Sequence, residues 1–225
     1  MNAAALDFAK ARETMVEQQV RPWDVLDVRV LEVLAALPRE AFVPQAYRDM
    51  AYSDMELPLA HGERSHKPVF EGRALQALAL EPGDSVLEIG TGCGYLTACL
   101  ARLSREVTSL ERHADLADAA RAVLDAQRIG NVRVETADAF AWDGERRFDA
   151  ICVGGAVDGI PGRFVQWLKP DGRMFVVRGR RPAMEAVLLR CTPDRNQVNA
   201  PRIDSLFETD LPYLAGAAPA PEFHF

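Results

Sequence analysis

The sequence predicts an α/β fold: a doubly wound, mostly parallel β-sheet with helices on both faces. Short apolar runs alternate with helical stretches from Ser85 onward, as in strands joined by crossover helices. The first of these runs passes directly into glycines that open a helix, in VLEIGTGCGY at 86–95. Strand-like runs near the end of the chain lack long helices between them, which predicts a C-terminal antiparallel hairpin.

Length, composition and charge limit the functions that we expect. The 225 residues are enough for one domain with an appendage. The 26 Lys and Arg against 33 Asp and Glu give a net charge of -7, which argues against nonspecific binding to nucleic acid or to an anionic membrane. No apolar run is long enough to span a membrane, and the first residues do not resemble a signal peptide, so we expect a cytoplasmic location. The four cysteines have neither CxxC nor zinc-ligand spacing, so we expect no metal site.

The first part of the chain, residues 1–80, is predicted to be a helical region with a long polar loop, packed on the core. Residues 7–19 contain neither Gly nor Pro. Helical periodicity at 27–37 places these side chains on one apolar face: Val28, Leu31, Leu34 and Leu37. Residues 38–68 lose this periodicity, contain four prolines and include the polar stretch AHGERSHKP at 60–68. A loop of this length suggests a function.

The second part, residues 81–225, is predicted to be the sheet domain that binds the cofactor. A short helix at 69–80 and a Pro-Gly-Asp turn at 82–84 lead into it. The predicted strands lie at 85–89, 106–110, 132–136, 149–153 and 173–177, with helices at 94–103 and 114–127. The hairpin is predicted at 186–190 and 203–211, around the turn-rich TPDRNQVNAP, and is followed by an extended Ala/Pro-rich tail at 215–221.

The glycine-rich turn indicates a nucleotide-type site at the carboxyl end of the first strand, because glycines let the backbone turn sharply and approach a ligand closely. A dinucleotide site needs G-x-G-x-x-G, whereas the spacing here is G-x-G-x-G, followed by Tyr95 and preceded by Glu88. A carboxylate at this place repels a pyrophosphate but suits a ligand with a cationic amino group. S-adenosylmethionine has such a group.

Two further strand ends carry acidic residues that suit the rest of this ligand. Glu111 ends the second strand, where its carboxylate can accept hydrogen bonds from both ribose hydroxyls. Asp138 and Ala139 follow the third strand, where a carboxylate and a backbone N–H can recognise the adenine edge. The alternative is that both acids are ordinary solvated or capping residues. We predict that the three acidic residues at these strand ends, Glu88, Glu111 and Asp138, together bind S-adenosylmethionine.

The motifs resemble those of class I S-adenosylmethionine methyltransferases and, among them, protein-L-isoaspartate O-methyltransferases. The similar blocks include MVEQQVRPWDVLDVRVLEVLAALPREAFVP at 15–44, AYRDMAYSDMELPLAHGE at 46–63 and VLEIGTGCGYLTACLA at 86–101. The resemblance implies a seven-stranded Rossmann-like sheet with a helical N-terminal extension and an isoaspartyl protein or peptide as the acceptor. It also implies these cofactor residues: Glu88, Gly90, Thr91, Gly92 and Gly94 for the methionine portion, Glu111 for the ribose, and Asp138 with Ala139 for the adenine. Arg112 is a further predicted cofactor residue.

The acceptor loop departs from the family pattern. In the family, His-Gly is followed by Gln-Thr-Ile-Ser, whose Thr and Ser help to hold the isoaspartyl carboxylate. Here Arg64 and His66 stand at the Thr and Ser positions, and Ser65 is offset from the family serine by one residue. These three are the candidate catalytic residues. Arg64 could pair with an acceptor carboxylate, whereas His66 could act as the base for a hydroxyl or phenol acceptor.

Three classes of function therefore stay open. The first is a methyltransferase that acts on an isoaspartyl carboxylate or on a changed acceptor, such as a small molecule. The second is a nicotinamide-dependent oxidoreductase, which Glu88 and the glycine spacing disfavour. The third is a non-catalytic protein that binds S-adenosylmethionine, which the altered loop favours. The sequence gives no indication of the oligomeric state.

Overall fold

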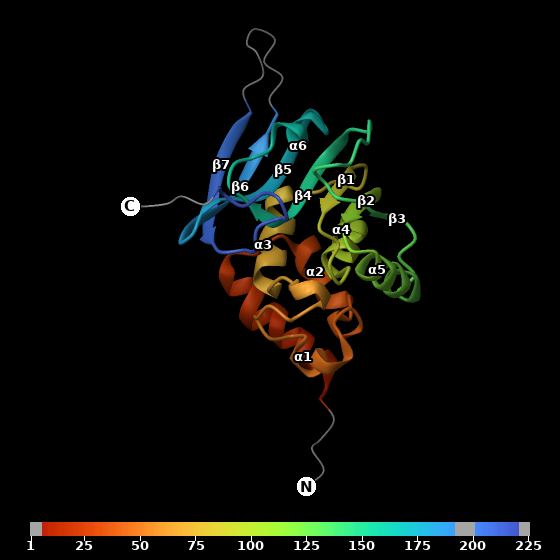
Figure 1. The fold of residues 1–225 in the computed structure, drawn as a ribbon. Coiled ribbons are helices and arrows are strands. Elements are labelled where there is room, and N and C mark those ends of the chain that lie inside the picture. The colour runs from red at the N-terminus through yellow and green to blue at the C-terminus, as the bar shows by residue number, and fades with distance from the viewer. Residues whose placement is uncertain (1–5, 192–200, 221–225) are drawn as a thin grey trace, which may run out of the picture.

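A seven-stranded sheet forms the centre of the molecule in a computed structural model that describes residues 6–191 and 201–220 (Figure 1). Its strand order is β3-β2-β1-β4-β5-β6-β7. The strands are β1 (Ser85–Ile89), β2 (Glu106–Glu111), β3 (Val132–Thr136), β4 (Phe148–Val157), β5 (Leu168–Arg180), β6 (Ala183–Arg190) and β7 (Arg202–Thr209). Strands β1 to β5 are parallel, and β6 and β7 are antiparallel to their neighbours, which confirms the predicted sheet and hairpin. The predicted turn TPDRNQVNAP lies outside the described residues except for its last proline.

The helices lie close to their predicted positions. They are α1 (Phe8–Thr14), α2 (Val28–Ala36), α3 (Pro68–Leu78), α4 (Tyr95–Leu103), α5 (Ala114–Ala126) and α6 (Gly162–Gln166). The segment η1 (Met15–Val20) continues α1 as a π-helix, and short 3-10 turns follow at η2 (Arg21–Trp23), η3 (Arg39–Ala41), η4 (Gln45–Met50) and η5 (Ala60–Gly62). Helix α6 was not predicted, because five residues are too few to show a helical period.

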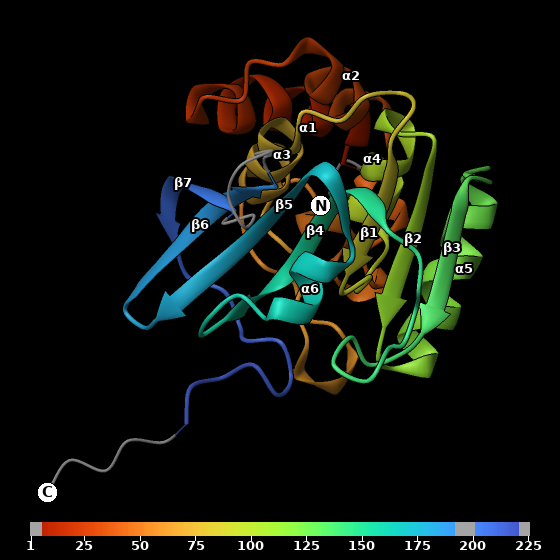
Figure 2. The same ribbon diagram turned by 90° about the horizontal axis from the view of Figure 1, so that it is seen from above.

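The two faces of the sheet are covered unequally. Alternate strand residues face opposite sides, so that Val86 belongs to one apolar core and Leu87 to the other. Helices α1 to α5 contribute to the first core, and Figure 2 shows α1, α2 and α3 together on one side of the sheet. The second face is covered by α6 and by a group of rings that includes Trp142 and Trp167. Helices therefore cover both faces as predicted, with one short helix on the second face.

Helix α2 corrects one detail of the predicted core. Leu31, Leu34 and Leu37 are buried as expected, but Val28 is 62% exposed and Val30 is buried instead. Val28 is the first residue of the helix, after the N-cap Asp27. Since the helical period is 3.6 residues, Val30 lies in line with Leu34 and Leu37, and the buried face begins there.

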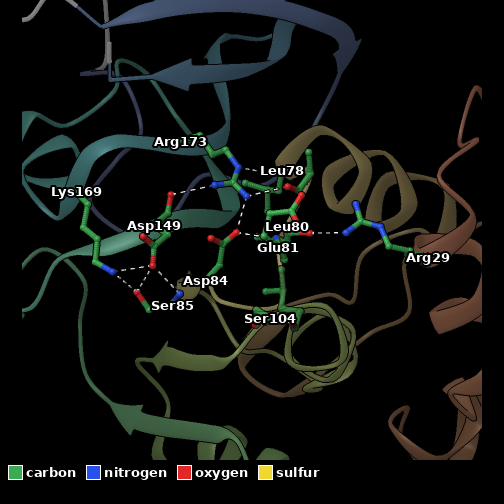
Figure 3. A network of polar contacts seen from close by, with 12 residues as sticks. Arg29, Leu78, Leu80, Glu81, Asp84, Ser85, Ser104, Asp149, Lys169 and Arg173 are labelled. Atoms are coloured by element: carbon green, nitrogen blue, oxygen red, sulfur yellow. Dashed lines mark hydrogen bonds and ion pairs between the residues drawn. The ribbon is translucent and has the colours of Figure 1, made fainter. Parts of the chain in front are cut away.

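A polar network joins the amino ends of the central strands (Figure 3). One carboxylate oxygen of Asp149 accepts hydrogen bonds from the Ser85 N–H at 2.8 Å, the Ser85 hydroxyl at 2.7 Å and the Lys169 ammonium at 2.7 Å. Arg173 on β5 pairs with Asp84 at 2.6 Å and donates to the Leu78 carbonyl at the end of α3. The network joins β1, β4 and β5 at their amino ends, whereas the glycine-rich turn lies at the carboxyl end of β1.

No helix within residues 6–191 and 201–220 is long and apolar enough to cross a bilayer.

Candidate active site

The glycine-rich turn adopts the backbone conformation that its residue types allow. Gly90, Gly92 and Gly94 have φ values of 94°, 53° and 82°, in the left-handed region that L side chains rarely adopt. The N–H groups of Gly90 and Thr91 both donate to the Leu110 carbonyl, at 2.8 and 3.3 Å. The turn therefore lies against the end of β2 and leads directly into α4.

A cavity lies at the carboxyl edge of the sheet, beside this turn. The turn, the ends of β2 and β3, the acceptor loop at 63–66 and the segment 211–215 all line it. The predicted site residues in its wall are Arg64, Ser65, His66, Gly90, Thr91, Gly92, Glu111, Arg112, Asp138 and Ala139. The structure thus brings together all the predicted site residues except Glu88 and Gly94, which are absent from the cavity wall.

Main-chain N–H groups hold the two carboxylates at the ends of β2 and β3. Glu111 is 5% exposed, and its two oxygens accept hydrogen bonds from the N–H groups of Gly92 and His113, both at 3.0 Å. One oxygen of Asp138 accepts from the Phe140 N–H at 2.8 Å. Each carboxylate oxygen has a further lone pair, so both groups can still accept a hydrogen bond from a ligand. Their orientation is set before any ligand arrives.

Glu88 lies beneath the glycine-rich turn and is fully buried. One of its carboxyl oxygens accepts hydrogen bonds from the hydroxyls of Thr97 and Ser109, both at 2.5 Å. The other oxygen has no partner among the residues that the structure describes. Burial away from water raises the pKa of Glu88 to about 8, because the charged form loses its hydration and the two hydroxyls compensate only in part. Its contact with a cofactor stays a prediction.

Two of the three candidate catalytic residues are engaged within the protein. The Ser65 hydroxyl accepts from the Leu57 N–H at 3.0 Å. His66 Nε2 lies 2.7 Å from the Gly154 carbonyl, which can only accept, so this nitrogen carries the proton. Burial lowers the pKa of His66, which favours the neutral imidazole. The exposed Arg64 has no ion-pair partner within the described parts of the chain.

Two histidines join the acceptor loop to the start of α5. The rings of His61 and His113 stack with their centroids 4.0 Å apart and their planes 1° from parallel. His61 Nε2 lies 2.8 Å from a carboxylate oxygen of Asp115, and His113 Nε2 lies 3.6 Å from Glu63. We call His61 and His113 the stacked histidine pair. The pair was not predicted, because no local sequence pattern relates two histidines that are so far apart in the chain.

The segment 211–215 forms a wall of the cavity that was also not predicted from the sequence. The Ala156 N–H donates to the Pro212 carbonyl at 2.8 Å, and the Leu214 N–H donates to the Ala156 carbonyl at 2.9 Å. The segment therefore adds a short extended piece beside the end of β4. The tail predicted at 215–221 is wrong in its first residues, because Ala217 still packs against β4 by accepting from the Asp158 N–H. Residue 221 lies outside the described residues.

In residues 6–191 and 201–220, no group of three His, Cys, Asp or Glu side chains is arranged to hold a metal ion.

Comparison with known proteins assigns the chain to a family. The family model for protein-L-isoaspartate(D-aspartate) O-methyltransferase matches residues 10–197. The chain belongs to this family. As a member of the protein-L-isoaspartate O-methyltransferase family, it is 43% identical to the protein-L-isoaspartate O-methyltransferase of Methylorubrum extorquens, an alignment that covers 83% of this chain and 81% of the relative. It is 38% identical to protein-L-isoaspartate O-methyltransferase 1 of Rhodopseudomonas palustris, over 97% of this chain and 90% of the relative.

A solved structure supports the fold. A putative protein-L-isoaspartate O-methyltransferase from Plasmodium falciparum, in complex with S-adenosyl-L-homocysteine, superimposes with a TM-score of 0.75 and 22% identity. The match covers 90% of this chain and 97% of that one. Family membership confirms the predicted methyltransferase class and S-adenosylmethionine as the cofactor, and the superposition confirms the Rossmann-like fold.

Proposed function

We propose that the protein transfers the methyl group of S-adenosylmethionine to the free α-carboxylate of isoaspartyl residues in proteins or peptides. The observation that carries this proposal is a single cavity with two kinds of wall. Glu111 and Asp138 line one part, where they suit a nucleoside, and Arg64 lines another with a guanidinium that has no ion-pair partner in the described chain. A cationic group of this kind suits an acceptor that is an anion.

The residues on the donor side fit the cofactor. S-adenosylmethionine supplies a methyl group on a positively charged sulfur. Glu111 is oriented to accept from the ribose hydroxyls, and Asp138 with the N–H of Ala139 is available for the adenine edge. Gly90 and Gly92 leave their positions free of side chains, so that a ligand can approach the backbone. One oxygen of buried Glu88 has no hydrogen-bond partner among the described residues, so it is free to accept from a polar or cationic group of the cofactor.

The acceptor side needs orientation more than acid-base chemistry. A carboxylate with a pKa near 4 is already a nucleophile at neutral pH, so no general base is required. Burial lowers the pKa of His66 and its Nε2 proton is held by the Gly154 carbonyl, so His66 is a weak base for a hydroxyl acceptor. Holding both reactants in attack geometry can lower the barrier by about 7 to 11 kcal/mol. We assign the orientation of the acceptor carboxylate to the cavity wall and to Arg64.

The test is methyl transfer from radiolabelled S-adenosylmethionine to an isoaspartyl peptide, with the matching aspartyl peptide as the control. We expect base-labile label on the isoaspartyl peptide alone. Binding of S-adenosylhomocysteine, measured by calorimetry in the same preparation, shows whether the cofactor site is intact. Tight binding without label on the peptide contradicts the proposed acceptor and favours a different acceptor or a protein that only binds the cofactor.

We also propose that the enzyme works in the cytoplasm. All four cysteines are free, as is usual in a reducing compartment. Cell fractionation with an antibody against the protein tests this, and recovery from an extracytoplasmic fraction contradicts it.

A further inference from the structure

A buried ion pair lies beneath the acceptor loop. Arg39 comes from η3 and Glu71 from α3, and their side chains are each 1% exposed. The Arg39 guanidinium donates directly to the Glu71 carboxylate. Removing two charges from water costs free energy that their mutual attraction often does not recover. The ion pair is therefore expected to contribute little to stability, and its other contacts indicate a further role.

The guanidinium of Arg39 touches three segments that build the cavity. Besides Glu71, it donates to the main-chain carbonyl of His66 at 2.6 Å. It also lies over the ring of Tyr95, 4.5 Å from the centroid, and this ring is fully buried. Tyr95 is the first residue of α4, directly after Gly94 of the glycine-rich turn. One planar group therefore connects the acceptor loop, the start of α3 and the helix that follows the turn.

The contact with Arg39 is one of two that hold the loop at His66. Arg39 holds the main-chain carbonyl of His66, and the Gly154 carbonyl holds its ring. Arg64, two residues earlier, lies in the cavity wall, and Glu71 lies there as well. A shift of His66 therefore moves the group that we expect to meet the acceptor.

We propose that Arg39, held by Glu71, is a positioning residue for methyl transfer. It sets the distance between the acceptor loop and the glycine-rich turn without touching the acceptor. The kinetic part of this inference rests on the proposed function. The part that concerns the order of the loop does not.

The first test separates positioning from stability by two replacements. In Arg39→Lys, a compact ammonium can pair with Glu71 but cannot also reach His66 and stack on Tyr95 with one planar fork. In the double variant Arg39→Met with Glu71→Leu, apolar side chains replace the whole pair, a change that often restores or raises stability. We expect kcat/KM for the isoaspartyl peptide to fall by about 10- to 100-fold in both variants. We expect the affinity for S-adenosylhomocysteine to stay near that of the wild type.

The second test does not depend on the acceptor. Trypsin cleaves after Arg64, whereas the bond between Lys67 and Pro68 resists it. Both variants should be cut faster at Arg64 than the wild type, as measured by mass spectrometry over time. The matched control is Arg173→Lys, which weakens an ion pair at the opposite edge of the sheet and should leave cleavage at Arg64 unchanged.

The outcomes distinguish the two proposals. A folded double variant with wild-type kinetics and wild-type cleavage at Arg64 overturns the role of Arg39. If the wild-type enzyme transfers no methyl group to isoaspartyl peptides, the proposed function fails, and the cleavage experiment still decides whether Arg39 orders the loop.

Discussion

At the scale of single residues, Arg64 is an exposed cationic side chain in the acceptor part of the cavity wall, and the described structure shows no ion pair for it. A guanidinium binds a carboxylate through two parallel hydrogen bonds, which an ammonium cannot copy. We expect Arg64→Ala to lower kcat/KM for an isoaspartyl peptide by about tenfold to 100-fold, which corresponds to losing a charged hydrogen bond. Arg64→Lys should recover only part of this. Initial rates over a range of peptide concentrations measure the effect, and unchanged kinetics in Arg64→Ala contradict the assignment.

Glu111 allows a test of the cofactor site. Its two oxygens accept from main-chain N–H groups, so the amide of Glu111→Gln places a donor against a donor and removes the charge. We expect affinity for S-adenosylhomocysteine to fall by about 1 to 3 kcal/mol, measured by calorimetry. Glu106→Gln, at the far end of the same strand, is the control and should bind normally. Equal affinities in both variants would remove Glu111 from the site.

Glu88 predicts a dependence of stability on pH. Its pKa is raised to about 8 by burial, so the folded protein keeps this proton at a pH where the unfolded chain has lost it. The stabilisation that Glu88 contributes is thus full below about pH 4.5 and declines as the pH rises toward 8. Glu88→Gln cannot lose a proton. Its free energy of unfolding, relative to the wild type, should therefore rise from about pH 5 to pH 8 in urea titrations. Glu32→Gln, at an exposed position, is the matched control for replacing a carboxyl group by an amide.

At the scale of helices and strands, the network of Asp149 joins β1, β4 and β5. Hydrogen bonds from Lys169 and Ser85 outweigh partial burial and lower the pKa of Asp149 to about 2. The stabilisation that ionised Asp149 contributes to the folded state is therefore present above about pH 4 and is lost as the pH falls toward 2. We expect Asp149→Asn to cost about 1 to 2 kcal/mol at neutral pH, allowing for partial exposure. In chemical unfolding experiments, the difference in the free energy of unfolding between Asp149→Asn and the wild type should vanish in acid. An unchanged difference at low pH contradicts this account.

Sequence patterns located most elements because the central strands are buried on both faces. The run SVLEI coincides with β1, since a strand covered on two sides is apolar nearly throughout. The glycine-rich turn and the acids after β2 and β3 were found for a similar reason, because each follows a recognisable strand. Helix α6 was not found because five residues show no helical period, and the wall at 211–215 was not found because its place depends on hydrogen bonds to the distant Ala156 on β4. Local patterns also cannot show that Ser65 and His66 are already engaged in hydrogen bonds.

At the scale of the whole molecule, the division into 1–80 and 81–225 stays a prediction about domains. One apolar core contains residues from both parts, among them Leu34 and Leu75 before the division and Phe175 after it. Removing 1–80 would expose this face of the sheet to water. We therefore expect the fragment 81–225 to lose cooperative thermal unfolding, measured by circular dichroism against the full chain. A fragment that unfolds as sharply as the whole protein would mean that the two parts are independent.

The wall at 211–215 has a consequence for how the enzyme folds during its synthesis. Chains emerge from the ribosome with the N-terminus first, and regions fold as they become available. The glycine-rich turn and the acidic strand ends therefore exist well before the segment that encloses them beside Ala156. A nascent chain has the cofactor residues without a closed cavity. The cavity is therefore closed only after residues 211–215 have left the ribosome, and any step that needs the full cavity wall starts no earlier than this.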